Sequence, residues 1–127
     1  MADDSGTLVS SGSSGNMPTG SGSERLCRAS IHELNNGTQT ILSGTPGHIY
    51  TIISVVFNNR TSGGGNIAII VNDGSNDISL YNSQNIPSNE TFVWNDKFVI
   101  EENDDLIVWN QHTNADWYVS YIDQDWT

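Results

Sequence analysis

The fold class is decided by the stretch HIYTIISVVFNN, residues 48–59. It is dominated by Ile, Val, Thr, Tyr and Phe, and it ends on a polar Asn pair, which is the composition of a β-strand. Its two alternating sets are both largely apolar: Thr51, Ile53, Val55 and Phe57 on one side, and Tyr50, Ile52, Ser54 and Val56 on the other. This predicts a central strand covered on both faces. One face belongs to the core, and the other packs against another subunit or under a loop.

Similar short runs recur along the chain and alternate with turn sequences such as Asn35-Asn36-Gly37 and Asn72-Asp73-Gly74. Asn-Gly and Asp-Gly favour hairpins whose central residues have positive φ. Eight or nine strands in about 100 residues predict an all-β fold, a two-sheet antiparallel sandwich of the jelly-roll or immunoglobulin-like type. The predicted strands are residues 25–34, 38–42, 49–58, 66–72, 77–82, 91–94, 97–100, 106–110 and 117–123.

Residues 1–23 differ from the rest, because twelve of the twenty-three are Gly or Ser. Leu8, Val9 and Met17 are their sizeable apolar side chains. Such a segment is typical of a flexible tail or linker, since ordering it costs about 1–2 kcal/mol per residue. The alternative hypothesis is an extended arm that is ordered by lying on other protein chains in a large assembly. The chain therefore divides into an arm, residues 1–23, and a β-sandwich domain, residues 24–127.

The charge balance excludes several partners. Four Lys and Arg residues stand against fifteen Asp and Glu, which gives a net charge of −11 and a pI near 4.1. Nucleic acids and anionic membranes need a basic patch, so neither is expected as a partner. No apolar run approaches the roughly 18 residues of a membrane span, and no signal peptide is evident. The single Cys27 excludes an intramolecular disulfide and a Cys-based zinc site.

No catalytic, metal-binding or cofactor-binding residue is predicted. His32, His48 and His112 lie outside the motifs of hydrolases and metalloproteases, and we expect them at the surface or at hairpin edges. Asp73-x-Ser75-x-Asp77 has the alternating oxygen spacing of a calcium loop but lacks the downstream Glu, so a hairpin turn is favoured. The four carboxylates within residues 101–105 are interpreted as a solvated turn.

The tryptophans suggest two kinds of role. Trp94 and Trp109 lie among apolar neighbours, which favours packing in the core or between the sheets. Trp126 lies beside acidic residues near the end of the sequence and is expected to be exposed or docked on a neighbouring chain. In an alternative hypothesis the chain is a lectin-like carbohydrate-binding module, in which Trp117, Tyr118 or Trp126 stacks on a sugar.

Residues 48–123 resemble the small β-sandwich structural proteins of the virions of tailed bacteriophages, notably those of cyanophages and other marine phages. Residues 48–59 resemble the early central strand of these proteins, and residues 66–71 with 78–80 resemble the next hairpin. The remaining similar segments are Ile86-Pro87-Ser88-Asn89-Glu90-Thr91, residues 98–101 with 103–108, and the closing residues 119–123.

The resemblance implies a non-enzymatic structural protein of the virion, present in multiple copies in a symmetric assembly or as a homo-oligomer. A capsid decoration, or cement, protein on the outer shell is the first expectation, with the major capsid protein or other virion proteins as partners. A neck, collar or tail component is the alternative. Arg25 and Arg28 lie where arm meets domain; they pair either with carboxylates of a capsid protein or with local acidic residues. The candidate partner-binding residues are Leu8, Val9, Met17, Arg25, Arg28 and Trp126.

Overall fold

The computed structural model describes residues 23–127 as nine β-strands without a helix. No helix able to span a bilayer therefore occurs in this range. All nine predicted strands are present, and the largest extensions are in the fifth, which continues to Ile86, and in the ninth, which runs from Ala115 to Asp125. The strands are β1 (Ser23–Leu34), β2 (Gly37–Ser43), β3 (His48–Asn59), β4 (Gly65–Asn72), β5 (Asp77–Ile86), β6 (Thr91–Trp94), β7 (Phe98–Ile100), β8 (Asp105–Asn110) and β9 (Ala115–Asp125).

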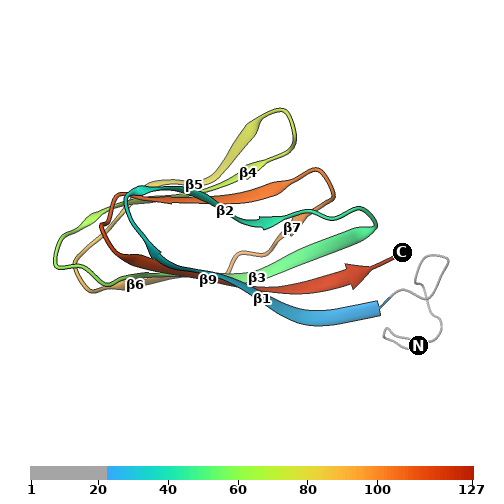
Figure 1. Cartoon of the computed structure of the whole chain (residues 1–127), viewed down its shortest axis with the longest axis horizontal. Helices are drawn as coiled ribbons and strands as arrows, with labels where there is room; N and C mark the ends of the chain where they lie inside the picture. Colours follow the sequence, from blue (N-terminus) through green and yellow to red (C-terminus); the bar gives the residue numbers. More distant parts are fainter. Residues whose placement is uncertain (1–22) are drawn as a thin grey trace.

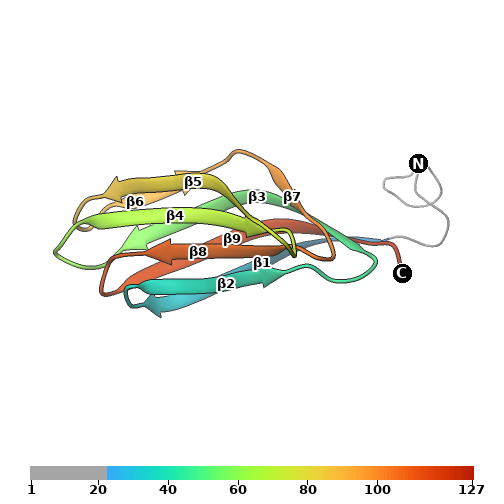
Figure 2. The same ribbon diagram turned by 90° about the horizontal axis from the view of Figure 1, so that it is seen from above.

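The strands form two antiparallel sheets that stack as a sandwich (Figure 1). Sheet 1 has the order β1-β9-β3-β6, with β7 also paired to β3, and sheet 2 has the order β2-β8-β4-β5. Within sheet 2, β4 and β5 are consecutive in the chain, whereas the connections β1 to β2, β2 to β3 and β3 to β4 pass from one sheet to the other (Figure 2). The predicted all-β, two-sheet sandwich is confirmed.

The core lies between the sheets and consists of the inward-facing side chains of both. Because side chains alternate across a strand, each sheet contributes every second residue to this layer. Phe57 and Trp117 are its largest members, with ring centroids 4.7 Å apart. The buried core residues are Ile31, Tyr50, Ile52, Val55, Phe57, Ile67, Ile69, Val71, Ile86, Ile100, Leu106, Val108, Ala115, Trp117 and Val119.

The predicted faces of β3 are wrong in one respect. The register of β3 against β9 shifts between Ile52 and Ser54. Tyr50 and Ile52 face the core before this bulge, and Val55 and Phe57 face it afterwards, so each predicted alternating set contributes to both faces. A bulge of one residue reverses the alternation, which a strict period of two cannot represent.

A buried asparagine ties three parts of the sandwich together. Asn110, with no exposed surface, accepts a hydrogen bond from Trp117 Nε1 at 3.0 Å. Its amide nitrogen donates to the backbone carbonyls of Leu34 and His112, at 3.2 and 3.1 Å. Every polar group of this side chain therefore has a partner inside the protein, as burial requires.

We expect Asn110→Ala to lower the free energy of unfolding by about 3 kcal/mol, because it leaves buried donors and acceptors without partners. Urea unfolding followed by tryptophan fluorescence measures the change. Asn82→Ala, at an exposed position of β5, is the control and should change stability little. Equal stability of the two variants would contradict the role assigned to Asn110.

Candidate functional site

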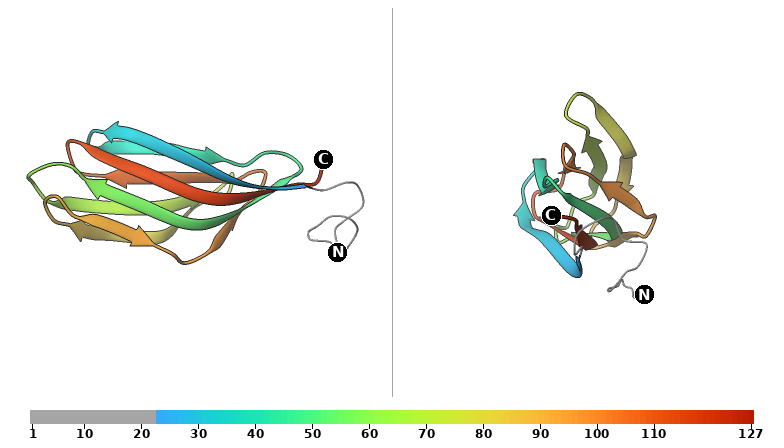
Figure 3. Two further views of the ribbon diagram at one scale, coloured as in Figure 1. Left: turned by 90° about the horizontal axis from the view of Figure 1, so that it is seen from below. Right: turned by 90° about the vertical axis from the view of Figure 1, so that its right-hand side faces the viewer.

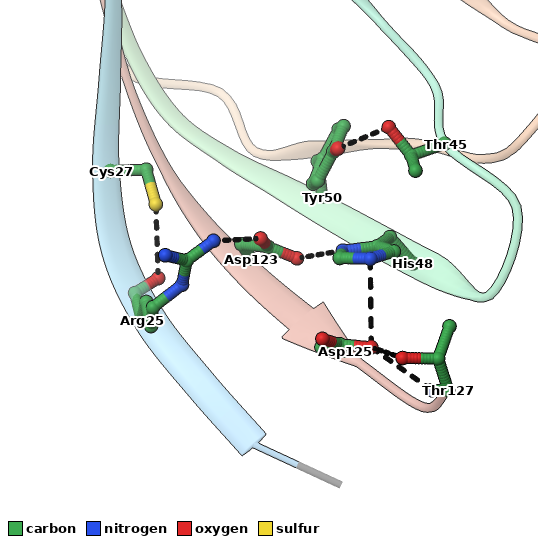
Figure 4. Close-up of polar contacts among 8 residues, drawn as sticks. All are labelled: Arg25, Cys27, Thr45, His48, Tyr50, Asp123, Asp125 and Thr127. Carbon is green, nitrogen blue, oxygen red and sulfur yellow. Dashed lines mark hydrogen bonds and ion pairs between the residues drawn. The ribbon is translucent and has the colours of Figure 1, made fainter.

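Three strands of sheet 1 meet at the end of the sandwich where β1 begins (Figure 3). Ser23 at the start of β1 pairs with Asp125 near the end of β9, and Asp125 pairs with His48 at the start of β3. The inward face at this end carries polar side chains instead of apolar ones. We call Arg25, His48, Asp123 and Asp125 the Asp123 cluster (Figure 4).

The carboxylate of Asp123 is the centre of this cluster. Its residue is only 4% exposed, and it accepts hydrogen bonds from both neighbouring strands. Arg25 of β1 donates to Oδ2 at 3.0 Å, and His48 Nδ1 of β3 lies 2.7 Å from Oδ1. Burying a carboxylate without partners costs free energy, whereas charged and hydrogen-bonding partners on both oxygens offset this cost. Asp123 therefore fastens β1 and β3 to β9.

Asp125 is the next inward-facing residue of β9 after Asp123, and its side chain is more exposed to solvent. It accepts hydrogen bonds from the hydroxyl and backbone N–H of Thr127, and its Oδ1 lies 3.5 Å from His48 Nε2. The hydrogen bonds from Thr127, with smaller contributions from the charges of His48 and Arg25, hold the pKa of Asp125 below its usual 3.8. The backbone N–H of Trp126 also donates to the carbonyl of Gly47 at 2.8 Å. The last residues are thus bound to the start of β3.

The two candidate arginines occupy opposite faces of β1. Arg25 pairs with Asp123 of its own chain, which is the local alternative of the two predicted for it. The hydrogen bond to Asp123 raises the pKa of the Arg25 guanidinium. Arg28 is exposed on the outer face, and no carboxylate within residues 23–127 lies within ion-pair distance of it. Binding of either arginine to another chain stays a prediction.

The outer face of sheet 1 carries a shallow depression of about 510 Å³ beside β1. Leu26 and Arg28 border it on one side, and Ile53 and Tyr118 contribute apolar surface from β3 and β9. Leu26 is 78% exposed, the highest exposure of any large hydrophobic residue in the described part, and Tyr118 is 38% exposed. A cluster of exposed apolar side chains with a basic neighbour is typical of a contact surface.

The histidines form no hydrolytic site in the described residues. His48 has the hydrogen bond to a carboxylate that orients a catalytic base, but its second nitrogen faces Asp125 instead of a nucleophile. His32 is exposed and lies 3.1 Å from Asp116. His112 is 2% exposed and bonds to the carbonyl of Ile86, so its predicted place at the surface is wrong. It fills the core beside Phe57.

The Asp73 loop has the geometry of a hairpin turn between β4 and β5. The Asp73 carboxylate accepts hydrogen bonds from the backbone N–H groups of Asn76 and Ser75, which lower its pKa, and Gly74 has a φ of 98°. In the acidic turn at residues 101–105, Asp104 accepts from the N–H of Glu101. Within residues 23–127, no three His, Cys, Asp or Glu side chains are grouped so that they could hold a metal ion.

The tryptophans differ in part from expectation. Trp117 is 1% exposed, so it cannot stack on a sugar as the lectin-like hypothesis suggested. Trp94 packs against the core, as expected, whereas Trp109 lies on the outer face of sheet 2 between the inward-facing Val108 and Asn110. Trp126 is half-buried against its own chain, and its docking on a neighbour stays a prediction. Leu8, Val9 and Met17 lie outside the described residues.

Asp123, the central residue of the site, is not among the residues predicted from the sequence. The signal that could have found it is the alternation in β9, where Trp117, Val119, Tyr121 and Asp123 occupy successive inward positions. A carboxylate at the end of such an apolar series is predicted to face the interior and to need a basic partner there.

The low pKa of Asp125 predicts a pH dependence of stability. The ionised carboxylate stabilises the fold above pH 3.8, and this contribution is lost as the pH falls through the lower pKa of the folded state. We expect the urea midpoint of Asp125→Asn to fall less than that of the wild type when the pH is lowered from about 5 to about 2. Glu102→Gln, in an exposed turn, is the control. Parallel curves for Asp125→Asn and the wild type would contradict the assignment.

No protein-family model and no curated protein matches the chain. Among solved structures, a chain of the disulfide-linked pili of Bacillus endospore appendages has a TM-score of 0.55 and 11% identity, over 91% of this chain and 99% of that one. A chain of infectious bursal disease virus, Gx strain, has a TM-score of 0.51 and 9% identity, over 90% of this chain and 37% of that one. A pentameric capsid protein from metagenomic phage sequences has a TM-score of 0.39 and 20% identity, over 76% and 61%. At these identities the first two similarities show the fold alone.

Proposed function

We propose that the chain is a non-enzymatic structural protein of a virion, and specifically a decoration protein that binds the outer shell of a capsid. The observation that carries the proposal is the contact surface on sheet 1. Leu26, Arg28 and Tyr118 are exposed beside the end of the domain where residues 1–22 join it. The Asp123 cluster holds this end of β1 in place, which gives an arm a firm point of attachment.

The connectivity of the strands supports this proposal. If β6 and β7 are counted as one interrupted strand, the eight strands follow the order 1-8-3-6 in sheet 1 and 2-7-4-5 in sheet 2. This is the order of a jelly roll, an architecture that occurs in viral capsid and lectin domains. Two solved structures with TM-scores above 0.5 come from a pilus and a virus, both of which are assemblies.

A disulfide-linked pilus is a poorer match for this chain than a virion. Propagating a polymer through disulfides requires at least two cysteines in each subunit, one for each neighbour. The sequence has one, Cys27, which can link two copies but cannot extend the series. Disulfides through this residue therefore join these chains no further than a pair.

The acidity of the chain is compatible with a position on the outside of a capsid. A net charge of −11 is repelled by packaged nucleic acid, so the domain is expected to face away from it. Binding to the assembled shell stabilises that shell by mass action. An arm that contacts a second site adds avidity to the contacts of the domain.

Deleting residues 1–22 should leave the fold intact and abolish binding to capsids, because β1 begins at Ser23 and the core lies wholly in residues 31–119. Cosedimentation of the full chain and the truncated chain with capsids of the phage that encodes them measures binding, and thermal unfolding serves as the folding control. Undiminished binding by the folded, truncated chain would overturn the proposed role of the arm.

The number of copies in each virion distinguishes a decoration protein from the neck, collar or tail alternative. A decoration protein covers a whole shell, so purified virions should contain it in numbers comparable to the major capsid protein. Quantitative mass spectrometry of virions gives this ratio. A ratio matching the single ring of a neck would support the alternative, and absence from virions would contradict both.

A further inference from the structure

The four outer edges of the two sheets differ in how well they are protected from pairing with another chain. The strands β6 and β7 are short, with four and three residues. The pairing of β5 with β4 has two register shifts, and that of β2 with β8 has one. The pairing of β1 with β9 also has one register shift, between Ile31 and Leu34, but it is unbroken from Ser23 to Ile31, a segment without proline. Natural proteins protect edges by short strands and bulges, and among the described edges the N-terminal part of β1 has neither.

The outward face of this edge has an alternating pattern of charge and apolar surface. Glu24, Leu26 and Arg28 are successive outward-facing residues, and all three are exposed. The acidic and the basic residue thus flank Leu26 at equal spacing. This arrangement is self-complementary, because reversing the direction of the strand exchanges the two charges and leaves the leucine in place.

We propose that this edge binds a second copy of the chain, with β1 pairing antiparallel to β1 of the other copy about a two-fold axis through Leu26. The register places Glu24 opposite Arg28 of the second copy, and Arg28 opposite its Glu24. The two Leu26 side chains face each other and cover the most exposed large hydrophobic residue of the domain. The pairing uses residues 23–29 and joins both copies of sheet 1 into one continuous sheet.

Other registers fit less well. Residues directly opposite each other in a sheet point to the same face, so outward-facing residues must pair with outward-facing ones. Two neighbouring registers also satisfy this condition. A pairing centred on Arg25 sets Glu24 opposite Leu26, and one centred on Cys27 sets Leu26 opposite Arg28. Neither register places opposite charges across from each other, whereas the register centred on Leu26 does so twice. Opposite charges on directly opposed residues stabilise a strand pair, and other combinations of these residues lack this stabilisation.

The Asp123 cluster orders the N-terminal part of β1 before this pairing forms. Arg25 faces inward and is bound to Asp123, so its charge is neutralised locally. Glu24 is likewise held on its own sheet, by a hydrogen bond from Gln124 at 2.9 Å. The segment is therefore already extended and ordered before a second copy arrives, which lowers the entropic cost of association.

A pairing of seven residues buries less surface than a standard stable interface, so the isolated dimer should be weak. The association should be stronger when many copies are bound to one particle, because their effective concentration is then high. This inference deepens the proposed structural role, because a protein present in many copies has the neighbours that the edge requires. Its test uses the full chain in solution without capsids. Failure of the dimer therefore leaves the copy-number and capsid-binding results unaffected.

Exchange of the two charges tests the register. Glu24→Arg places arginines opposite each other at both ends of the pair, and Arg28→Glu does the same with glutamates. Each single variant should weaken the dimer about tenfold, and the double variant should restore it. Sedimentation equilibrium measures the dimer constant, and thermal unfolding verifies the fold. Equal association of all four proteins, or failure of the double variant to recover, would overturn the proposal.

Cross-linking tests the same register independently. In the proposed pair, the two Leu26 Cα atoms lie about 4.5–5.5 Å apart, within reach of a disulfide, whereas the two Cys27 Cα atoms are separated by about 8 Å. With oxidised glutathione as the oxidant, the Leu26→Cys, Cys27→Ser double variant should form a disulfide dimer much faster than the wild type does through Cys27. Faster cross-linking of the wild type, or no dimer from the double variant, would overturn the proposal.

Discussion

The hydrogen bonding of the buried Asp123 carboxylate is the interaction on which the end of the sandwich where β1 begins depends. Its two oxygens bind Arg25 and His48, which belong to the strands on either side of β9. Apolar packing ends before this row, since the inward side chains beyond Tyr50 and Tyr121 are polar. Because hydrophobic contact no longer joins the sheets there, the shape of the end is set by hydrogen bonds within sheet 1. Removing the carboxylate would leave the first residues of β1 held by backbone pairing and by the exposed hydrogen bond between Glu24 and Gln124.

Most of the fold follows from local patterns in the sequence. Runs rich in Ile, Val, Thr and aromatic residues mark most of the strands, with β1 as an exception, and Gly, Asn and Asp mark the turns, because these preferences arise from backbone geometry. The faces of β3 were not predictable, since the bulge at Ile53 depends on its register against β9. The burial of His112 and the partners of Asp123 were not predictable either. Both depend on contacts between residues more than 20 positions apart in the chain.

The edge of β1 connects this local chemistry to assembly. A two-fold pair centred on Leu26 sets the two Ser23 residues about 20 Å apart, on opposite sides of the axis. Such a dimer has two copies of every contact surface of the domain and can contact two neighbouring sites on a lattice, where the second contact benefits from the high effective concentration created by the first.

Charge makes such a contact selective. Two copies, each with a net charge of −11, repel one another in general, but at physiological ionic strength this repulsion is screened beyond about 8 Å. The described residues include four Lys and Arg: Arg25 is bound to Asp123, Arg60 lies near Glu33 and Asp116, and the exposed Arg28 and Lys97 have no described carboxylate within ion-pair distance. On the edge of β1, Arg28 therefore provides attraction at short range. Pairing along this edge is favoured in the register that brings Arg28 to a carboxylate, because a shifted register leaves Arg28 without one.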